Sequence, residues 1–429
     1  MTAVVGILNQ QAVAVAADSA VTVRGANGIK IFNQANKIFT LSKRHPIGVM
    51  IYNSATLMGV PWETIIKSYR HQLGGKELTS VEEYQSDFIN YLHKNDFFMS
   101  ESDQLSYYED FFYSSLISIK NDVSKENPEI LGLGGLEQDK AFSKLLLGFL
   151  KKFTQLIESQ SEKCEEFKNV SNETILDFIE DPLKKSVVLF FSKDYKPSKA
   201  LFTALKKFFS TIIKHKGTLD NFTGLVFTGF GSEDIYPKLI PINISLVVKD
   251  RLKYFVDRRN SATISYDMNS AIRPFAQTDV IDTILSGVAP ELESTFMENF
   301  ELFFSKYNEL LIKEVDNPDV ETLIRRINVP ELISNYADQI AQVKTTYHIK
   351  PLMNAVSFLS KEDLAEMAES LIYLTYLKRR ITFAEESVGG PVDVAVISKG
   401  DGFIWLKRKH YFKPELNGHF FENYFNFEG

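Results

Sequence analysis

The chain has 429 residues, of which 44% are hydrophobic and 24% are charged, a balance typical of a folded globular protein. Its 34 Phe and 18 Tyr exclude an intrinsically disordered chain, and no apolar run approaches the roughly 18 residues of a membrane span. The formal net charge of -7 gives no electrostatic support for binding to nucleic acid.

The start of the chain predicts a β-hairpin. Residues 2–8 and 12–17 are short apolar runs, separated by a polar turn at 9–11. The second run, AVAVAA, is apolar on both faces, so its strand should be buried on both sides, in a sheet covered by two layers. Two more strands are predicted at 37–41 and 47–52. The first residues lack the basic flank of a signal peptide, so we expect a cytoplasmic protein.

Two helices are predicted to follow these strands. In the first, at residues 61–73, Pro61 lies in the first turn, where a helix tolerates proline. The apolar stripe of this helix consists of pairs spaced four apart, namely Trp62 with Ile66 and Ile65 with Tyr69. The second helix begins at Ser80, because Ser80 and Glu83 form the Ser-x-x-Glu pattern of a capping box.

Between about residues 96 and 218 the sequence is typical of helices rich in Phe, Leu and Lys. In 140–157 and 198–215, apolar residues recur every three or four positions and lysines fill the opposite face. A basic amphipathic helix can bind a membrane or an acidic partner. Acidic segments lie close by, so the favoured interpretation is that these helices pack on a core and expose their lysines to water.

Strands return in the second half of the chain, at 222–229 and 238–247. A helix at 279–286 is followed by a second helical block over roughly 291–354. No internal repeat of fixed period accompanies these elements.

The last part of the chain predicts one helix and one hairpin. Ser360 and Asp363 form a capping box at the start of the helix. The buried stripe of this helix is predicted to be Leu364, Met367, Leu371 and Leu374. A hairpin is then predicted from strands at 392–398 and 403–406, which are joined by a tight turn.

The residue types available for catalysis are limited. A single cysteine, Cys164, lies in a polar stretch and cannot form an internal disulfide. The seven histidines are scattered, without the close spacing of a zinc site. We therefore expect no metal and no cofactor, and a reaction site built from hydroxyls, carboxylates and lysines.

Thr2 is the most informative position for chemistry. A small residue after Met1 is the setting in which the initiator Met is normally removed, which would leave Thr2 with both a hydroxyl and a free α-amine. Such an amine titrates near roughly 7.7–8.0 and can act as a base at neutral pH. A threonine that uses its own amine in this way is a recognised nucleophile. A Met-Thr start alone is common, so the hypothesis depends on the residues that follow.

Residues 2–23, TAVVGILNQQAVAVAADSAVTV, resemble the opening of proteasome β subunits and of the bacterial threonine peptidase of the related ATP-dependent ring protease. The spacing from Thr2 to Asp18 matches that family without a gap. The family's lysine lies in a Lys-apolar-Phe element, which matches Lys37 in NKIFTL, and Lys30 in GIKIF is the competing choice. Lys37 is preferred because the strand predicted at 47–52 follows it at the family's distance.

The end of the chain resembles the same family independently. The segment SVGGPVDVAVISKGDGFIWL is similar to the family's last hairpin, in which Gly-Gly and Asp-Val-Ala-Val-Ile precede a Gly-containing turn. The segment TGLVFTGFGSEDIYPKLIPINI fits the family's order of elements. Together the three segments place the resemblance over roughly half of the chain.

The resemblance implies a role for each matched residue. The Thr2 hydroxyl would attack a carbonyl while its own amine takes the proton. An ammonium at Lys37 would lower the pKa of both groups, and Asp18 would keep that lysine charged and oriented. The alternative for Asp18 and Lys37 is a structural ion pair at the ends of strands.

Several positions depart from the family's pattern. The glycine whose N–H helps to hold the oxyanion is replaced by Asn53, which keeps a backbone donor and tolerates positive φ. The acidic residue and the serine before Gly-Gly correspond to Glu385 or Glu386 and, one place out of register, to Ser387. A further family serine falls near Thr278. These four residues are the candidates for supporting the N-terminus.

The fold implied is α+β, namely the four-layer αββα sandwich of N-terminal nucleophile hydrolases. Its core is expected from residues 1–95, 219–290 and 355–429, with helical insertions at 96–218 and 291–354. The domain boundaries therefore do not divide the chain linearly.

The activity implied is hydrolysis of an amide bond, in a peptide, through an acyl-enzyme on Thr2 after removal of Met1. The relatives form rings, so we expect a homo-oligomer, and the sequence does not identify an ATP-dependent unfoldase partner. Two alternatives stay open: an amidohydrolase of the same fold that acts on a small amide, and a catalytically inactive assembly subunit. Binding of a membrane or of nucleic acid through the lysine-rich helices is disfavoured.

Overall fold

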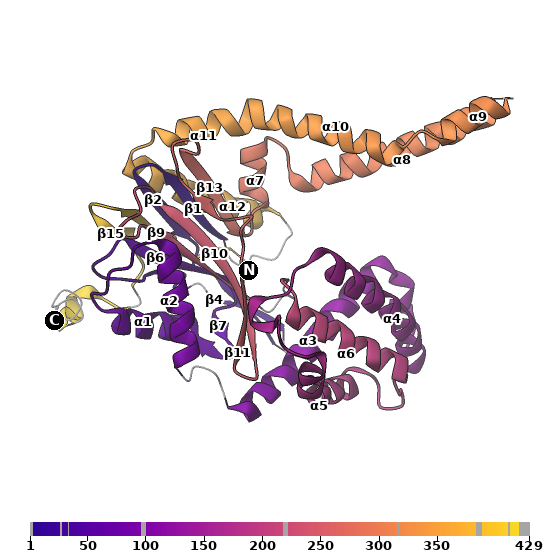
Figure 1. The fold of residues 1–429 in the computed structure, drawn as a ribbon, viewed down its shortest axis with the longest axis horizontal. Coiled ribbons are helices and arrows are strands. Elements are labelled where there is room, and N and C mark those ends of the chain that lie inside the picture. The colour runs from indigo at the N-terminus through magenta and orange to yellow at the C-terminus, as the bar shows by residue number, and fades with distance from the viewer. Residues whose placement is uncertain are drawn as a thin grey trace. The chain divides into compact units, whose positions relative to one another are not determined.

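The protein has a mixed α+β fold with several antiparallel sheets, in agreement with the expected class (Figure 1). The chain divides into two compact units that are both discontinuous in sequence. Unit 1 contains Met1–Ile38, Ile235–Lys238 and Ala262–Gly429, and unit 2 contains Phe39–Asp234 and Leu239–Ser261. The computed structural model describes residues 3–25, 28–32, 34–95, 100–217, 222–315, 317–382, 388–410 and 412–419.

Unit 1 is built on a five-stranded sheet. Its strands are Ala3–Asn9 (β1), Ala12–Ala17 (β2), Ser270–Ala276 (β13), Asp393–Ser398 (β14) and Gly402–Lys407 (β15). Their order in the sheet is β13-β1-β2-β14-β15. The two predicted hairpins are confirmed, because β1 pairs with β2 and β14 pairs with β15 in antiparallel register. Every residue of β2 is buried, as its two apolar faces predicted.

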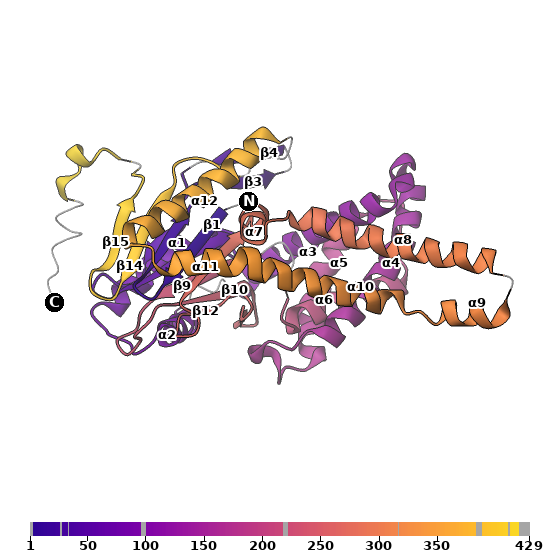
Figure 2. The ribbon, with the colours of Figure 1, turned by 90° about the horizontal axis from the view of Figure 1, so that it is seen from above.

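Three helices of unit 1 accompany this sheet, at Asp279–Ser286 (α7), Lys350–Ser357 (α11) and Lys361–Ile381 (α12). Helix α12 lies on β1, β2 and β14, α11 lies on β13 and β1, and α7 packs on α12 (Figure 2). One face of β2 contributes only alanines to the shared core, and α12 contributes Ala365 and Ala368. Methyl side chains on both elements allow the helix to pack closely on the sheet.

The N-terminus of α12 is capped as predicted, whereas its buried stripe differs in part. The Ser360 hydroxyl accepts the Asp363 N–H, and the Asp363 carboxylate accepts the Ser360 N–H. Leu364 and Leu371 are buried, but the prediction for Leu374 was wrong, because this side chain is 44% exposed. The helix turns its smaller residues toward the sheet instead, so the buried face is completed by Ala365, Ala368, Ile372 and Thr375.

The helices predicted over 291–354 form a long hairpin in unit 1. They are Pro290–Glu314 (α8), Pro318–Arg325 (α9) and Val329–Lys344 (α10), and a π-helical turn joins α10 to α11. The start of α8 meets the end of α10, where Lys344 Nζ lies 2.5 Å from a Glu293 carboxylate oxygen. Figure 2 shows the hairpin extending away from the sheet of unit 1. We call α8, α9 and α10 the arm.

Unit 2 is built on a second sheet. Its sixth and shortest strand, Ala262–Thr263 (β12), pairs with β10. The other strands are Ile38–Thr40 (β5), Ile47–Asn53 (β6), Thr223–Gly229 (β9), Lys238–Val248 (β10) and Arg251–Val256 (β11). Their order is β11-β10-β9-β6-β5, and all but β11 were predicted. Gly229 pairs with Ile47 at a φ of +135°, and a Cβ at this position would lie 2.1 Å from the Pro46 oxygen. Only glycine fits the end of this strand pair.

Two helices of unit 2 follow β6 as predicted, at Trp62–Leu73 (α1) and Val81–Lys94 (α2). Pro61 is the N-cap of α1 and not part of its first turn, so its missing N–H removes no helical hydrogen bond. At α2, Ser80 Oγ accepts the Glu83 N–H, while the Glu83 carboxylate accepts the N–H of Thr79, one residue earlier than in a capping box. The predicted stripe of α1 is buried and comprises Trp62, Ile65, Ile66 and Tyr69.

Four longer helices of unit 2 pack on one another. Helix α3 contacts α4 and α5, and helix α6 contacts the same two helices. They are Glu101–Glu126 (α3), Gly135–Gln160 (α4), Asn172–Phe190 (α5) and Lys199–Lys214 (α6). Lysines on these helices pair with acidic residues of neighbouring helices, as Lys185 does with Glu109 and Lys206 with Glu180. This arrangement agrees with the core-packing interpretation. None of the described helices is both long enough and apolar enough to cross a membrane.

The sequence patterns missed β11, β13 and the hairpin of Val21–Gly25 (β3) with Gly28–Phe32 (β4). They also missed three two-residue strands, namely Thr56–Leu57 (β7), Val60–Pro61 (β8) and Ala262–Thr263 (β12). Strand β13 contains Pro274, which disfavours the interior of a sheet. In the structure β13 is the edge strand beside β1, so the missing N–H of proline is tolerated there.

Lys253 of β11 is buried within unit 2, where its Nζ donates to the carbonyl oxygens of Ile212 at 2.6 Å and Gly217 at 2.5 Å. Burial lowers the pKa of Lys253 from 10.5 to about 8. The unfolded chain therefore holds this proton more tightly than the folded one. The contribution of Lys253 to stability should rise as the pH increases from about 8 toward 10.5.

We compare the free energy of unfolding of the wild type with that of Lys253→Met. The difference between them should change by about 2 kcal/mol in favour of the wild type as the pH rises from roughly 7 to 9.5. Urea unfolding at several pH values measures this difference, and the exposed substitution Lys407→Met is the control. Parallel pH profiles for the wild type and Lys253→Met would contradict the prediction.

Candidate functional site

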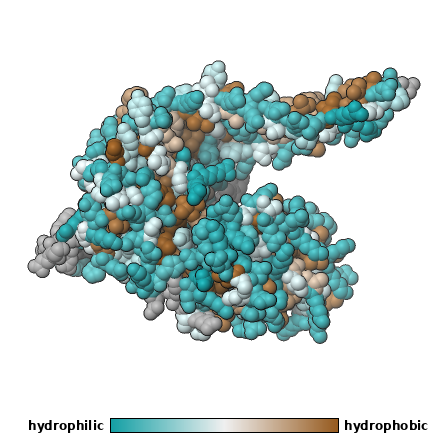
Figure 3. Space-filling view, viewed as in Figure 1, coloured by the Kyte–Doolittle hydropathy of each residue, from teal (hydrophilic) through white to brown (hydrophobic). Residues whose placement is uncertain are grey.

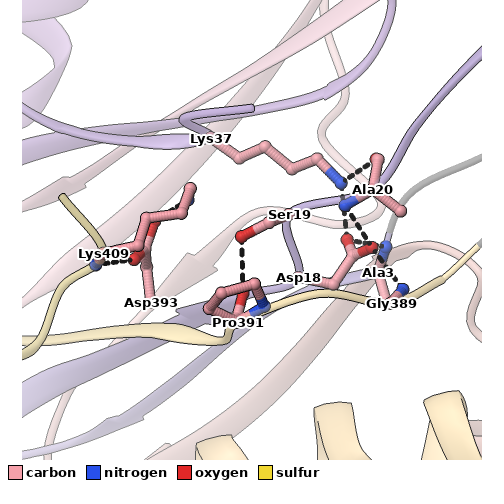
Figure 4. Close-up of polar contacts among 9 residues, drawn as sticks. All are labelled: Ala3, Asp18, Ser19, Ala20, Lys37, Gly389, Pro391, Asp393 and Lys409. Carbon is pink, nitrogen blue, oxygen red and sulfur yellow. Dashed lines mark hydrogen bonds and ion pairs between the residues drawn. The ribbon is translucent and has the colours of Figure 1, made fainter. Parts of the chain in front are cut away.

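The candidate site of unit 1 is centred on the carboxylate of Asp18, which directly follows β2. Asp18 is buried, and its Oδ1 accepts the Ala3 N–H at 2.9 Å and a hydrogen bond from Lys37 Nζ at 2.6 Å. Its Oδ2 accepts the N–H groups of Ala20 and Gly389, both at 3.1 Å. Figure 4 shows these four donors converging on one side chain from separate stretches of the chain.

Lys37 lies immediately before β5 and is also buried. Its Nζ donates to the Ala20 carbonyl oxygen at 2.6 Å in addition to Asp18. Burial lowers the pKa of Lys37, and the neighbouring Asp18 carboxylate opposes this shift. Lys37, the lysine preferred from the sequence, contacts Asp18. The competing lysine, Lys30, lies in β4, where its backbone is paired in register with Val23.

The backbone next to Thr2 is fixed by the same contacts. The Ala3 nitrogen belongs to the peptide bond that joins Thr2 to Ala3, and the Ala3 carbonyl oxygen accepts the Asp18 N–H at 3.1 Å. On the other side of β1, Ala3 is opposite Ala276, which has a φ of +66°. A left-handed conformation is uncommon for a residue other than glycine and often occurs at functional sites.

The segment before β14 closes the site from a third side. The Ser19 N–H donates to the Gly389 carbonyl oxygen at 3.1 Å, and the Ser19 hydroxyl donates to the Pro391 carbonyl oxygen. Close by, the buried Asp393 carboxylate pairs with Lys409, and both groups act electrostatically on Lys37 (Figure 4). The N-terminal and C-terminal parts of unit 1 are therefore held together by polar contacts at this site.

The other predicted site residues have separate outcomes. Thr2, Glu385, Glu386 and Ser387 lie outside the described residues. Thr278 is the N-cap residue of α7, two positions after Ala276, and its side chain makes no capping hydrogen bond.

Asn53 belongs to unit 2, at the end of β6. Its φ is +68°, a conformation that asparagine adopts more readily than most residues, in line with the replacement of a family glycine. Its side-chain amide donates to the Phe222 carbonyl oxygen at 2.9 Å.

Sequence reasoning assigned no role to Ser19, Ala276 or the Asp393–Lys409 pair. A signal for Asp393 was present, because an aspartate that opens an otherwise apolar strand needs a charged partner when it is buried. The left-handed Ala276 carries no signal in the sequence, because alanine does not itself favour that conformation.

The arrangement places an ammonium and a carboxylate beside the peptide bond that follows Thr2. A positive charge there favours the deprotonated forms of a nearby amine or hydroxyl. Within the described part of the chain, no group of three or more His, Cys, Asp or Glu residues is placed to hold a metal ion.

Comparison of the chain with protein-family models finds no match, and comparison with curated proteins finds none either.

We expect Asp18→Asn to destabilise the protein by about 3–5 kcal/mol, because Lys37 would be left buried without its counter-charge. The matched control is Asp401→Asn, which removes an exposed partner of Lys361 and should change stability much less, because water screens this pair. Urea unfolding measures both variants. Equal effects of the two substitutions would contradict the importance of the buried pair.

Proposed function

We propose that the protein is an N-terminal nucleophile hydrolase of the proteasome type, with Thr2 as the nucleophile after removal of Met1. The observation that carries this proposal is the shared acceptor Asp18 Oδ1. This atom binds both the backbone N–H of Ala3, the residue after Thr2, and the ammonium of Lys37. The matched residues Asp18 and Lys37 thus contact each other, and Asp18 contacts the residue that follows Thr2 in the chain.

In the proposed reaction, the Thr2 hydroxyl attacks the carbonyl carbon of an amide, and the α-amine of Thr2 takes the hydroxyl proton. The proton then passes to the leaving nitrogen as the C–N bond breaks, which leaves an ester between Thr2 and the acyl group. Water attacks this ester with the same amine as base, and the carboxylic acid is released. The reaction uses no metal or cofactor.

Lys37 and Asp18 support this chemistry by their charges. The Lys37 ammonium would lower the pKa of the Thr2 amine and hydroxyl, so more of the amine is free to accept a proton at neutral pH. Asp18 balances the cost of burying that ammonium and fixes its direction through the 2.6 Å hydrogen bond. The competing function of this pair is purely structural, and the pH experiment below separates the two.

Supporting roles are proposed for the remaining matched residues. The Asn53 N–H would stabilise the oxyanion, a contact whose loss costs about 2.7–4 kcal/mol in other hydrolases. Thr278, Glu385, Glu386 and Ser387 would hold the N-terminal amine. The positive φ of Asn53 agrees with its position at a family glycine.

The proposed fold is the four-layer αββα sandwich. In this sandwich, each unit would supply one sheet and the helix layer packed on that sheet. Helix α12 packs on the sheet of unit 1, and α2 packs on the sheet of unit 2. Residues 96–218 and 291–354 would be insertions into this sandwich.

The proposed substrate is a peptide, because the resemblance is closest to peptidases of this fold. We also propose that the protein is a cytoplasmic homo-oligomer, which would form a ring as members of the resembled family do. Whether an unfoldase works with this ring is left open by the proposal. A small-amide amidohydrolase and an inactive assembly subunit are the two alternatives. Activity on peptide amides distinguishes the peptidase from both of them, and a β-lactone adduct on Thr2 distinguishes the amidohydrolase from the inactive subunit.

Intact mass spectrometry with and without a β-lactone tests the nucleophile. We expect a mass that lacks Met1 and a single lactone adduct on the wild type. Thr2→Ser should keep the adduct and Thr2→Ala should lose it, with unchanged thermal stability in both. Retention of Met1 would reduce the protein to the inactive assembly alternative, and an adduct on Thr2→Ala would overturn the assignment of Thr2 as the nucleophile.

The pH dependence of lactone acylation tests Lys37. The acylation rate should rise with pH as the Thr2 amine loses its proton, with a midpoint at or below roughly 7.7–8.0. Lys37→Met should move this midpoint upward, because the ammonium no longer disfavours the protonated amine. Lys361→Met, at an exposed ion pair, is the matched control and should leave the midpoint unchanged. An unshifted midpoint in folded Lys37→Met would assign the pair a structural role only.

A further inference from the structure

The arm of unit 1 has one apolar stripe that its two long helices bury against each other. Residues of α8 that recur every seven positions are partly buried, as are residues of α10 that are spaced by four and three. The ion pair of Glu293 with Lys344 closes this contact at one end. The partly buried residues are Met297, Phe304 and Leu311 of α8 and Ile333, Ala337 and Ile340 of α10.

A second apolar stripe of α8 is exposed. Its members are spaced by four, three, four and three residues, which is the heptad spacing of helices that pack against a partner. Their side chains are 41–61% exposed. The stripe consists of Phe296, Phe300, Phe303, Tyr307 and Leu310.

Helix α10 carries a matching exposed stripe of Leu332, Tyr336 and Val343, which are 41–53% exposed. The rings of Phe300 and Tyr336 lie 5.6 Å apart, so the two stripes share one side of the arm. We call these eight residues the arm face. Figure 3 shows apolar residues along the outer part of the arm.

The composition of the arm face limits what can bind it. None of its eight residues is charged, so it offers nothing to an anionic surface or a charged peptide. The five aromatic side chains alone expose roughly 500 Å² per chain. If the aromatic side chains of two such faces are fully buried, they supply about 1,000 Å², which is the lower limit for a specific interface.

We propose that the arm face docks on the arm face of a second copy of this chain. A flat two-helix surface with heptad spacing is complemented by another surface of the same kind, and the product is a four-helix bundle with two-fold symmetry. Phe303 is the central member of the α8 stripe and would lie near the symmetry axis. This inference does not depend on the hydrolase proposal, because the arm face contains none of the site residues.

Sedimentation and light scattering of the full chain test the proposal. We expect the wild type to have at least twice the monomer mass of 48.9 kDa, and Phe303→Glu to halve the observed mass. The dissociation constant should rise at least about tenfold, the size expected for loss of a central aromatic anchor. The matched control is Leu189→Glu in α5, which replaces another exposed apolar residue. This substitution should leave the mass of the particle in solution unchanged. A monomeric wild type, or a mass unaffected by Phe303→Glu, would overturn the proposal.

Disulfide cross-linking gives a test that does not depend on disrupting the interface. The single native cysteine, Cys164, is buried, so an introduced thiol reports on its own position. Phe303→Cys should form a covalent dimer under mild oxidation, whereas Glu301→Cys, on another side of α8, should not. Equal cross-linking of the two variants, or none in Phe303→Cys, would show that a different partner covers the arm face.

Discussion

The buried carboxylate of Asp18 is the interaction on which the candidate site depends. It accepts hydrogen bonds from Ala3, Ala20, Lys37 and Gly389, so a single side chain joins four stretches of unit 1. A buried ammonium at Lys37 is tolerated because this carboxylate lies 2.6 Å away. The interaction on which the proposed chemistry depends is therefore also one that holds the two ends of unit 1 together.

The strand order of unit 1 explains how these stretches meet. Strand β2 lies between β1 and β14, so the residue that follows β2 is adjacent to the start of β1 and to the segment before β14. The alanine face of β2 permits close packing of α12, which supports the central strands from one side. A rigid sheet in this position restricts the polar residues at its end to one arrangement, as a preorganised reaction site requires.

The arm has a separate physical logic. Its helices bury one stripe against each other and leave a second, uncharged stripe in water. In the proposed dimer, burial of the aromatic residues of this stripe would favour the assembled state. The polar cluster around Asp18 and the apolar arm face belong to the same unit but use different interactions. Charge and hydrogen bonding define the first, and the area of apolar surface defines the second.

Local sequence patterns determined many elements by themselves. The alternation in AVAVAA predicted a fully buried strand, and the caps at Ser80 and Ser360 marked the starts of two helices, because these signals act between residues close in sequence. The pairing of Asp18 with Lys37 was expected only from a resemblance. Tertiary structure decided the geometry of this pair. It also decided the left-handed conformation of Ala276, the edge position that tolerates Pro274, and the union of two stripes into the arm face. These features arise from contacts between residues far apart in the chain, and no local pattern specifies which distant partner will be present.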